Sequence, residues 1–199
     1  MVSTWFEREI REQPEVLAGL LADGRALTDE IAARIRAYGP HSVVIAARGA
    51  SANAGRYAQY AFGVRNRLSV ALANPSLYTV YHQPPDLSGT LVIGISQSGQ
   101  STDIVTVVDE ARRQGALTLA VTNDPASPMA AAADLCFPLL AGVERAVAAT
   151  KTYSSELLAI AILSAALGVD GDDWDALSAV PDALAATIEA NEGLTERTA

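Results

Sequence analysis

The sequence predicts an α/β fold, a three-layer αβα arrangement in which helices cover both faces of a doubly wound parallel sheet of about five strands. The first observation is alternation: short apolar runs, the length of buried strands, are followed by segments with helical periodicity at roughly 25-residue spacing. The second observation is that polar loops with glycine or proline separate these runs. The pattern leaves the order of the strands open.

Two helices are expected within residues 4–38, before the first strand. Thr4 and Glu7 form a capping-box pattern at the start of the first helix. Asp23-Gly24 interrupts the apolar stripe, and Gly39-Pro40 stops the second helix. We expect these helices to serve packing or dimerisation.

The alternation then continues to residue 167. The predicted strands are 42–47, 68–72, 91–95, 117–121 and 135–137. The predicted helices are 52–62, 103–114, 127–133 and 151–167, while 78–81 is ambiguous. Residues 169–199 are predicted to be an acidic linker, with a helix from about Trp174 and another from Pro181. This gives three segments: N-terminal helices (1–40), an α/β domain (41–168) and the linker (169–199).

The composition excludes several classes of protein. The net charge is −9 and no basic stripe is visible, which argues against a nucleic-acid-binding domain. No run reaches the roughly 18 apolar residues of a membrane span, and residues 1–10 lack the apolar core of a signal peptide. Cys136 is the single cysteine and only His41 and His82 accompany it, so we expect neither a disulfide nor a metal site. Together these features predict a cytoplasmic protein.

The strongest functional signal is the loop 96–102, Ser-Gln-Ser-Gly-Gln-Ser-Thr, between the predicted strand 91–95 and the next helix. An open α/β sheet binds ligands at this kind of position, and free N–H groups at a helix start favour an anion. Short hydroxyl and amide side chains suit a phosphate monoester, and Gly99 permits close approach or a positive φ. The alternative is an ordinary surface turn with Ser101 or Thr102 as the helix N-cap.

Gly49-Ala50-Ser51 is a second candidate, because it follows the first predicted strand and should open on the same edge of the sheet. Two adjacent loops of this kind would face one ligand. Arg48 is close enough in sequence to reach a phosphate there, with a solvated arginine as the alternative.

The segment before the predicted helix 151–167 supplies further candidates. Lys151 is a candidate for binding an anion or a carbonyl, although ordinary surface usage favours a solvated lysine in the first helical turn. Glu144 is a candidate base for which the sequence identifies no partner. Cys136 and His82 are expected to be structural, since the cysteine lies in an apolar strand without positive neighbours.

The usual nucleotide fingerprints do not occur. Gly49 begins no G-x-G-x-x-G, and the chain contains no G-x-x-x-x-G-K-S/T. This argues against NAD and ATP, and we expect no cofactor. A flavin-binding domain stays an alternative, because its phosphate loop is also rich in Ser and Thr.

Four segments resemble a known family. Residues 95–103 are very similar to the S-Q-S-G-E-T phosphate loop of the sugar isomerase (SIS) domain. Residues 6–14 resemble the M-x-K-E-I-x-E-Q-P opening of the isomerase module of glucosamine-6-phosphate synthase. Residues 48–51 correspond to the C-G-T-S motif of this module, and residues 142–151 correspond to its G-x-E-x-x-V-A-S-T-K motif. Their order, over about residues 5–167, resembles the first SIS copy of this module and of related tandem-SIS sugar-phosphate aminotransferases and deaminases.

The resemblance implies a flavodoxin-like SIS fold, a role in amino sugar metabolism and no cofactor. The implied substrate-binding residues are Ser51, Ser96, Gln97, Ser98, Gly99, Ser101, Thr102, Val147 and Ala148, with Gly49, Glu144 and Lys151 as further candidates. Val147 and Ala148 would act through their backbone. Ala50, Gln100 and Ala149 replace a threonine, a glutamate and a serine of the family's motifs, which leaves the sugar open.

The resemblance also implies that catalytic groups are missing. In the family, the catalytic glutamate and lysine lie on the helix after the glycine loop of a second SIS copy. The predicted helix 52–62 contains no Asp, Glu or Lys, and residues 169–199 resemble the linker between copies. Isomerisation needs a positioned base, so we expect the chain alone to bind substrate without turning it over.

Two functions follow from these observations. The first is one half of a tandem-SIS isomerase, aminotransferase or deaminase that binds a hexose 6-phosphate, such as fructose 6-phosphate or glucosamine 6-phosphate. The second is a stand-alone sugar-phosphate-binding or regulatory module that acts as a homodimer. The expected partners are therefore a sugar phosphate and either a second SIS domain or a second copy of the chain, and neither nucleic acid nor a membrane.

Overall fold

The computed structural model describes residues 4–168 and 174–192 and confirms the predicted α/β fold. The strands are β1 (Ser42–Ala47), β2 (Ser69–Leu72), β3 (Thr90–Ile95), β4 (Leu117–Thr122) and β5 (Leu135–Pro138). They form one parallel sheet in the order β2-β1-β3-β4-β5. The chain runs outward from β1 in one direction to β2 and in the other to β3, so the loops after β1 and β3 flank the point where the winding reverses.

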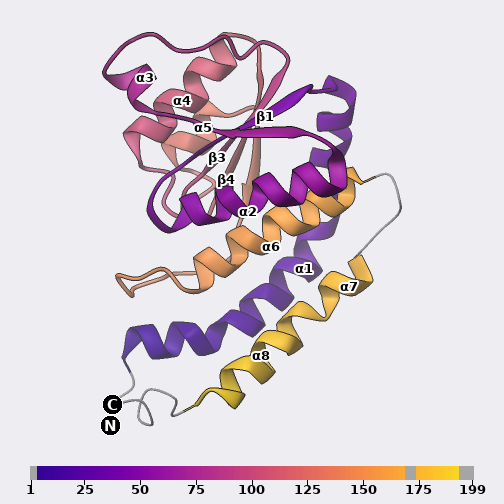
Figure 1. The fold of residues 1–199 in the computed structure, drawn as a ribbon. Coiled ribbons are helices and arrows are strands. Elements are labelled where there is room, and N and C mark those ends of the chain that lie inside the picture. Colours follow the sequence, from indigo (N-terminus) through magenta and orange to yellow (C-terminus); the bar gives the residue numbers. More distant parts are fainter. Residues whose placement is uncertain (1–3, 169–173, 193–199) are drawn as a thin grey trace.

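Helices cover both faces of the sheet (Figure 1). One face carries α3 (Ser76–Thr79), α4 (Thr102–Arg113) and α5 (Pro128–Ala132), and the other carries α2 (Gly49–Asn66) and α6 (Lys151–Leu167). Each face has its own apolar core, and β3 and β4 are buried along their whole length between the two cores. A strand buried on both faces shows no alternation of polar and apolar residues, which explains the continuous apolar runs of the sequence.

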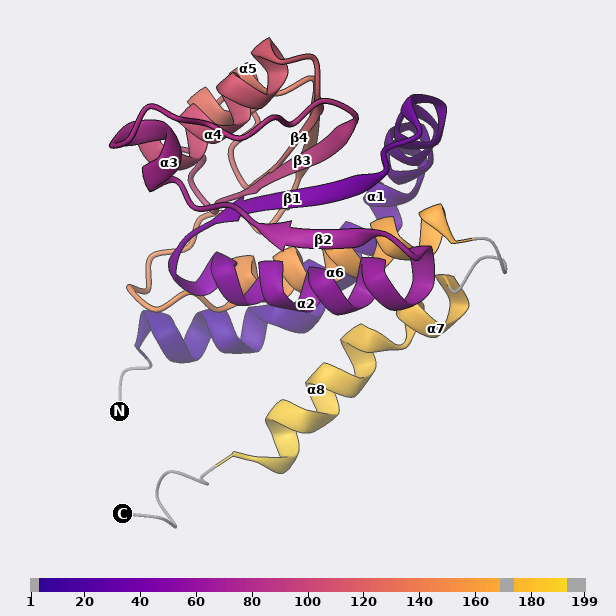
Figure 2. The same ribbon diagram turned by 45° about the horizontal axis from the view of Figure 1, so that its top comes forward.

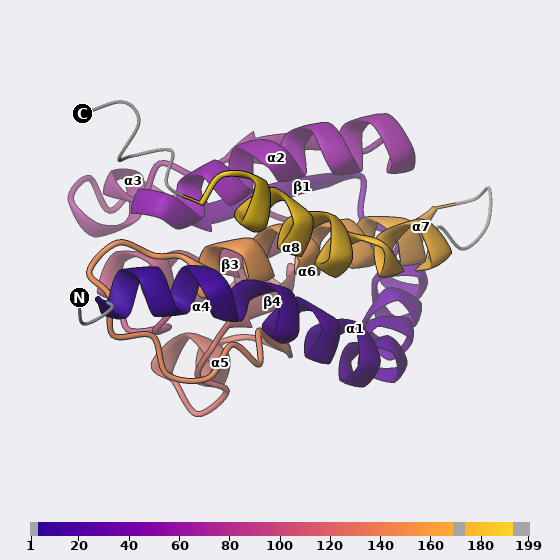
Figure 3. The same ribbon diagram turned by 90° about the horizontal axis from the view of Figure 1, so that it is seen from below.

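Three more helices lie outside α2 and α6. They are α1 (Trp5–Tyr38), α7 (Trp174–Ser178) and α8 (Val180–Ala190). Figure 3, in which the molecule is seen from below, shows α1 and α8 side by side in front of α6, and α1 contacts both α6 and α8. The packing role expected of the N-terminal segment is therefore confirmed. Of the helices in the described ranges, none is both long enough and apolar enough to cross a lipid bilayer.

The N-terminal segment forms one helix of 34 residues, so the prediction of two helices was wrong. Its start was predicted correctly, since the Thr4 hydroxyl accepts a hydrogen bond from the Glu7 N–H in a complete capping box. Gly24 does not end the helix, because it is buried near Phe137 and Ile162. This packing outweighs the roughly 1 kcal/mol that a glycine costs inside a helix. The axis of α1 changes direction along its length (Figure 2).

The other elements lie close to their predicted positions. The bounds of β1 and α6 agree with the prediction, and the ambiguous segment around residue 78 belongs to the short helix α3. The predicted starts near Trp174 and Pro181 correspond to α7 and α8, whereas 169–173 and 193–199 of the predicted linker lie outside the described residues. The largest shift is at α2, which begins at Gly49 and not at Ala52. Gly49-Ala50-Ser51 is therefore the first turn of a helix.

Candidate functional site

The two predicted ligand loops lie side by side at the carboxyl edge of the sheet. Strands β1 and β3 are neighbours, and their last residues, Ala47 and Ile95, are paired in register. The segment that starts at Arg48 and the loop that starts at Ser96 therefore leave the sheet at the same level. An ion pair between Arg48 Nη1 and Asp103 Oδ2, 3.1 Å long, joins the start of α2 to the first turn of α4.

The loop 96–102 has a defined internal structure. The buried Ser96 hydroxyl accepts a hydrogen bond from the Gly99 N–H (3.2 Å), and the Ser98 hydroxyl accepts one from the Gln100 N–H (3.3 Å). Gly99 has φ +61°, and a Cβ at this position would collide with the Ser127 hydroxyl. Only glycine combines a positive φ with the absence of a Cβ. The loop therefore holds its shape through contacts within the chain.

The loop ends at the uncapped start of α4. Ser101 occupies the N-cap position, but its hydroxyl makes no capping hydrogen bond. The backbone N–H groups of the first helical turn, beginning with Thr102, have no acceptor within the helix. Together with the helix dipole, these donors form a suitable site for an anion. The alternative of a surface turn predicted that Ser101 or Thr102 would cap the helix, and neither side chain does so.

Glu144 organises the third predicted segment. Its carboxylate accepts hydrogen bonds from the Thr150 N–H (3.0 Å), the Thr152 N–H (3.1 Å) and the hydroxyls of both threonines. The Gln97 side-chain amide also donates to it (3.1 Å), which links this segment to the 96–102 loop. Because these contacts occupy both carboxylate oxygens, Glu144 is a structural anchor of the site and not a free base.

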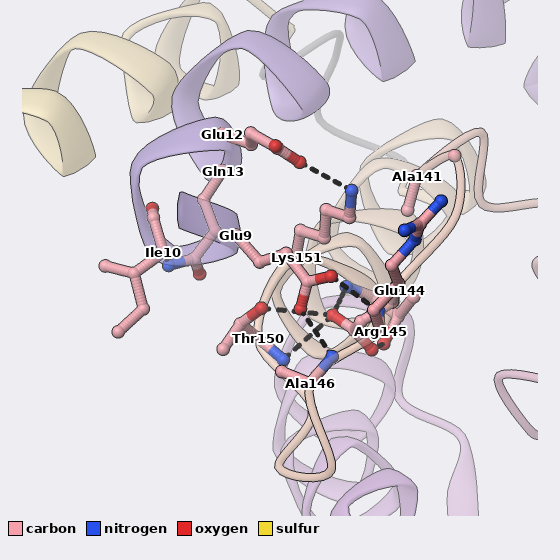
Figure 4. Close-up of polar contacts among 12 residues, drawn as sticks. Glu9, Ile10, Glu12, Gln13, Ala141, Glu144, Arg145, Ala146, Thr150 and Lys151 are labelled. Carbon is pink, nitrogen blue, oxygen red and sulfur yellow. Dashed lines mark hydrogen bonds and ion pairs between the residues drawn. The ribbon is translucent and has the colours of Figure 1, made fainter. Parts of the chain in front are cut away.

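Helix α1 fixes the same segment from outside (Figure 4). Glu9 is buried and accepts hydrogen bonds from the N–H groups of Arg145 (2.5 Å) and Ala146 (3.0 Å). Lys151 is also buried, and its ammonium group contacts the Glu12 carboxylate at 2.6 Å. The interpretation of Lys151 as a solvated lysine was wrong, because α1 covers the start of α6 and supplies a counter-ion.

An open groove of about 640 Å³ lies between the loops. Its lining residues are Gln97, Ser98, Gln100, Asn123, Asp124, Leu140, Gly142, Val143 and Glu144. Asn123 was not singled out from the sequence, yet it joins the two sides: its N–H donates to the Gln97 carbonyl (3.0 Å) and its amide donates to the Gly142 carbonyl (2.7 Å). Val147 and Ala148 are exposed beyond this lining, on the segment that leads to Thr150.

Ser51 contacts a buried acid that sequence reasoning missed. Its hydroxyl donates to Glu156 Oε1 at 2.8 Å. Burial, and to a smaller extent the negative charge of Glu144, raise the pKa of Glu156 to about 7, although the Ser51 hydrogen bond acts in the opposite direction. Glu156 is the only acidic residue in the apolar helix α6. An isolated acidic residue in an apolar helix is the sequence feature that could have identified it as a candidate. The site therefore holds a carboxyl group that changes protonation near neutral pH.

Cys136 lies on β5 and is half-buried. Burial, with a smaller effect of Asp124, raises the pKa of its thiol. A raised pKa suppresses the reactive thiolate, which agrees with the expected structural role.

Residues 38–166 match the model of the SIS domain family. The chain belongs to this family. Among curated relatives, the chain is 36% identical over 170 residues to a glutamine–fructose-6-phosphate aminotransferase (isomerizing) of Symbiobacterium thermophilum. The match covers 81% of this chain and 27% of that relative.

Solved structures agree with this assignment. The chain superimposes with a TM-score of 0.88 and 39% identity on a protein of Silicibacter pomeroyi DSS-3 assigned as a phosphosugar isomerase, covering 92% of this chain and 56% of that one. The C-terminal domain of glucosamine-fructose-6-phosphate aminotransferase from Francisella tularensis has a TM-score of 0.74 at 23% identity, covering 98% and 56%. The chain thus spans about a quarter of the curated relative and about half of these solved chains.

Proposed function

We propose that the chain binds a phosphosugar, a hexose 6-phosphate such as fructose 6-phosphate or glucosamine 6-phosphate, through the loop 96–102. The observation that carries this proposal is the uncapped start of α4, where the Ser101 hydroxyl and the first-turn N–H groups have no capping partner. Membership of the SIS family supports a phosphosugar over other anions, since relatives with this domain are named for fructose 6-phosphate.

In this proposal the phosphate lies against Ser96, Ser98, Ser101 and Thr102, with Gln97 and Gly99 shaping the loop. The sugar extends towards Gly49 and Ser51 on one side and towards the backbone of Val147 and Ala148 on the other. The register of β1 and β3 supports this arrangement, because it places the first turn of α2 beside the phosphate loop. Glu144 and Lys151 act indirectly, by holding the segment 142–151 in place.

We further propose that the chain is the first SIS half of a sugar-phosphate isomerase, aminotransferase or deaminase. Residues 1–40 would be packing helices, 41–168 the SIS domain and 169–199 a connection to a second SIS copy. The partial coverage of the relatives supports this, since each of them extends well beyond the matched region. The chain alone is then expected to bind substrate without turning it over.

Titration calorimetry with a panel of hexose 6-phosphates tests the site. Ser101→Ala should weaken binding about 10-fold, the worth of one hydrogen bond to a charged group. Ser88→Ala is the matched control, because Ser88 is an exposed serine just before β3, at the opposite edge of the sheet. Equal affinity of both variants would contradict the loop assignment, and stabilisation by a flavin in place of a hexose phosphate would favour the flavin alternative.

The second candidate is a stand-alone sugar-phosphate-binding or regulatory module that works as a homodimer. The exposed apolar side chains Tyr57, Tyr60 and Val64 on α2 favour it, because a partner copy would bury them. A cytoplasmic location stays a prediction under both candidates.

A further inference from the structure

Two adjacent side chains on α6 stand out among the described residues, because each has a buried polar atom without a hydrogen-bond partner. These atoms are Ser155 Oγ and Glu156 Oε2. Buried polar groups in folded proteins are nearly always hydrogen-bonded, so each exception requires an explanation. Glu156 is the more informative of the two, since it is only 1% exposed and also contacts a residue of the proposed ligand site.

The surroundings of Glu156 do not compensate a negative charge. Ser51 on α2 donates one hydrogen bond to Glu156 Oε1. Glu144, in the segment before α6, acts on Glu156 with a negative charge. On α1, the carboxylates of Glu9 and Glu12 bind the backbone at 145–146 and the Lys151 ammonium group, and they supply no positive charge.

The cations at the starts of α6 and α2 pair with other carboxylates. Lys151 on α6 contacts Glu12, and Arg48 before α2 pairs with Asp103. Within the described residues Glu156 has no ion-pair partner, so the site favours the neutral acid.

We infer that Glu156 is a positioning residue that sets the direction of the Ser51 hydrogen bond, and that a proton from solvent binds Glu156 when an oxyanion of the ligand binds at Ser51. This inference rests on the proposed function, in which Ser51 contacts the phosphosugar. A serine hydroxyl has one proton to donate. While Glu156 is a carboxylate, Ser51 donates that proton to it and offers the ligand only lone pairs, which repel an oxyanion.

Protonation of Glu156 reverses the hydrogen bond. The carboxylic acid then donates to Ser51 Oγ, and the Ser51 O–H becomes free to donate to the ligand. The pKa of Glu156, raised to about 7 by burial, makes both states accessible at neutral pH. The ligand's negative charge favours the protonated state further. Affinity should therefore be highest below the pKa of Glu156 and fall by up to about 10-fold per pH unit above it.

The test is calorimetric titration with fructose 6-phosphate at pH 6, 7 and 8, each in two buffers of different ionisation enthalpy, which counts protons taken up. Glu156→Gln keeps the shape of the side chain but cannot titrate. At pH 7 the wild type should take up about half a proton more per bound ligand than this variant. The ligand's own phosphate titrates equally in both proteins and cancels in the comparison. Asp109→Asn, which removes an exposed acid on α4, should behave as wild type.

Equal proton uptake and parallel pH profiles in wild type and Glu156→Gln would overturn the inference and leave the proposed function intact. Absence of hexose-phosphate binding by the wild type at every pH would overturn both. If circular dichroism shows that Glu156→Gln is unfolded, Ser51→Ala replaces it, because removal of the hydroxyl also uncouples Glu156 from the ligand. Proton uptake by Ser51→Ala equal to that of the wild type would then overturn the inference.

Discussion

At the scale of a single residue, Gly99 sets the shape of the loop 96–102. It combines a positive φ of +61° with a backbone position that leaves no room for a Cβ beside Ser127. We expect Gly99→Ala to lower the free energy of unfolding by about 2–5 kcal/mol, from about 1–2 for the left-handed backbone and about 1–3 for the collision. Urea unfolding measures this loss.

Gly115→Ala is the matched control for Gly99. Gly115 also has a positive φ (+81°), but a Cβ there would meet no atom within 4 Å. This variant should therefore show only the backbone cost, about 1–2 kcal/mol. Equal losses in the two variants would contradict the steric argument, as would a failure of Ser127→Gly to recover part of the stability of Gly99→Ala.

Glu156 makes stability depend on pH. Its folded-state pKa of about 7 lies above the ordinary value of 4.5, so the folded protein binds the proton more tightly than the unfolded chain. The associated stability is present below pH 4.5 and is lost as pH rises to about 7. We expect Glu156→Gln to be more stable than wild type at pH 8, by up to about 3 kcal/mol, with the difference vanishing below about pH 4.5. Parallel curves of melting temperature against pH would contradict this.

At the scale of residues, the sequence predicted the position of the loop 96–102 between a strand and a helix, but it did not reveal the residues that support the site. Ser96 to Thr102 are consecutive, so their clustering is visible in the sequence. Glu9 and Glu156 are separated from the groups they bind by more than 100 residues. Only the folded chain brings such pairs together, and an acidic residue alone carries no sign of its partner.

Helix α1 and the segment 142–151 form a unit at the scale of elements. Glu9 accepts hydrogen bonds from two N–H groups of that segment. The contact between Glu12 and Lys151 links α1 to the start of α6. We expect Glu9→Gln to increase hydrogen exchange at the Arg145 and Ala146 amides by roughly 10-fold, because the side-chain amide keeps one acceptor oxygen and its NH2 group cannot accept the second hydrogen bond. Exchange measured by mass spectrometry or NMR provides the readout.

Glu15→Gln serves as the control for this prediction, since Glu15 is an exposed acid on the same helix. It should leave exchange in the segment unchanged. Unaltered protection of Arg145 and Ala146 in Glu9→Gln would show that the segment holds its shape without α1.

The bounds of elements were predictable where a local signal marks them. Helix α6 runs from Lys151 to Leu167, as predicted. Its long apolar run and the glycine that follows it are local signals of a helix and of its end. Helix α1 shows the opposite case, since Gly24 has the local signature of a break. Its burial against Phe137, a residue more than 100 positions away, overrides that signature.

At the scale of the whole molecule, the exposed face of α2 bears on whether two copies of the chain associate. Tyr60 and Val64 are 74% and 79% exposed on one face of this helix, and a groove of about 250 Å³ continues from them to Leu177 on α7. If the chain acts as a homodimer, Tyr60→Glu with Val64→Glu should convert a dimer into a monomer in light-scattering measurements, because burying the new charges is costly. Val80→Glu, at a valine that is 68% exposed, is the control. A monomeric wild type would contradict the homodimer candidate. A dimer that tolerates both glutamates would exclude this face of α2 as its interface.

The sequence by itself determined the fold class, the strands and the position of the loop 96–102, which resembles a motif of the SIS family. These depend on residues that are neighbours in the chain, so local periodicity and spacing record them. Only the tertiary structure decided the strand order, the continuity of α1, the burial of Lys151 and the pairing of Ser51 with Glu156. Each of these depends on contacts between distant segments, whose free energy exceeds the local preferences that the sequence displays.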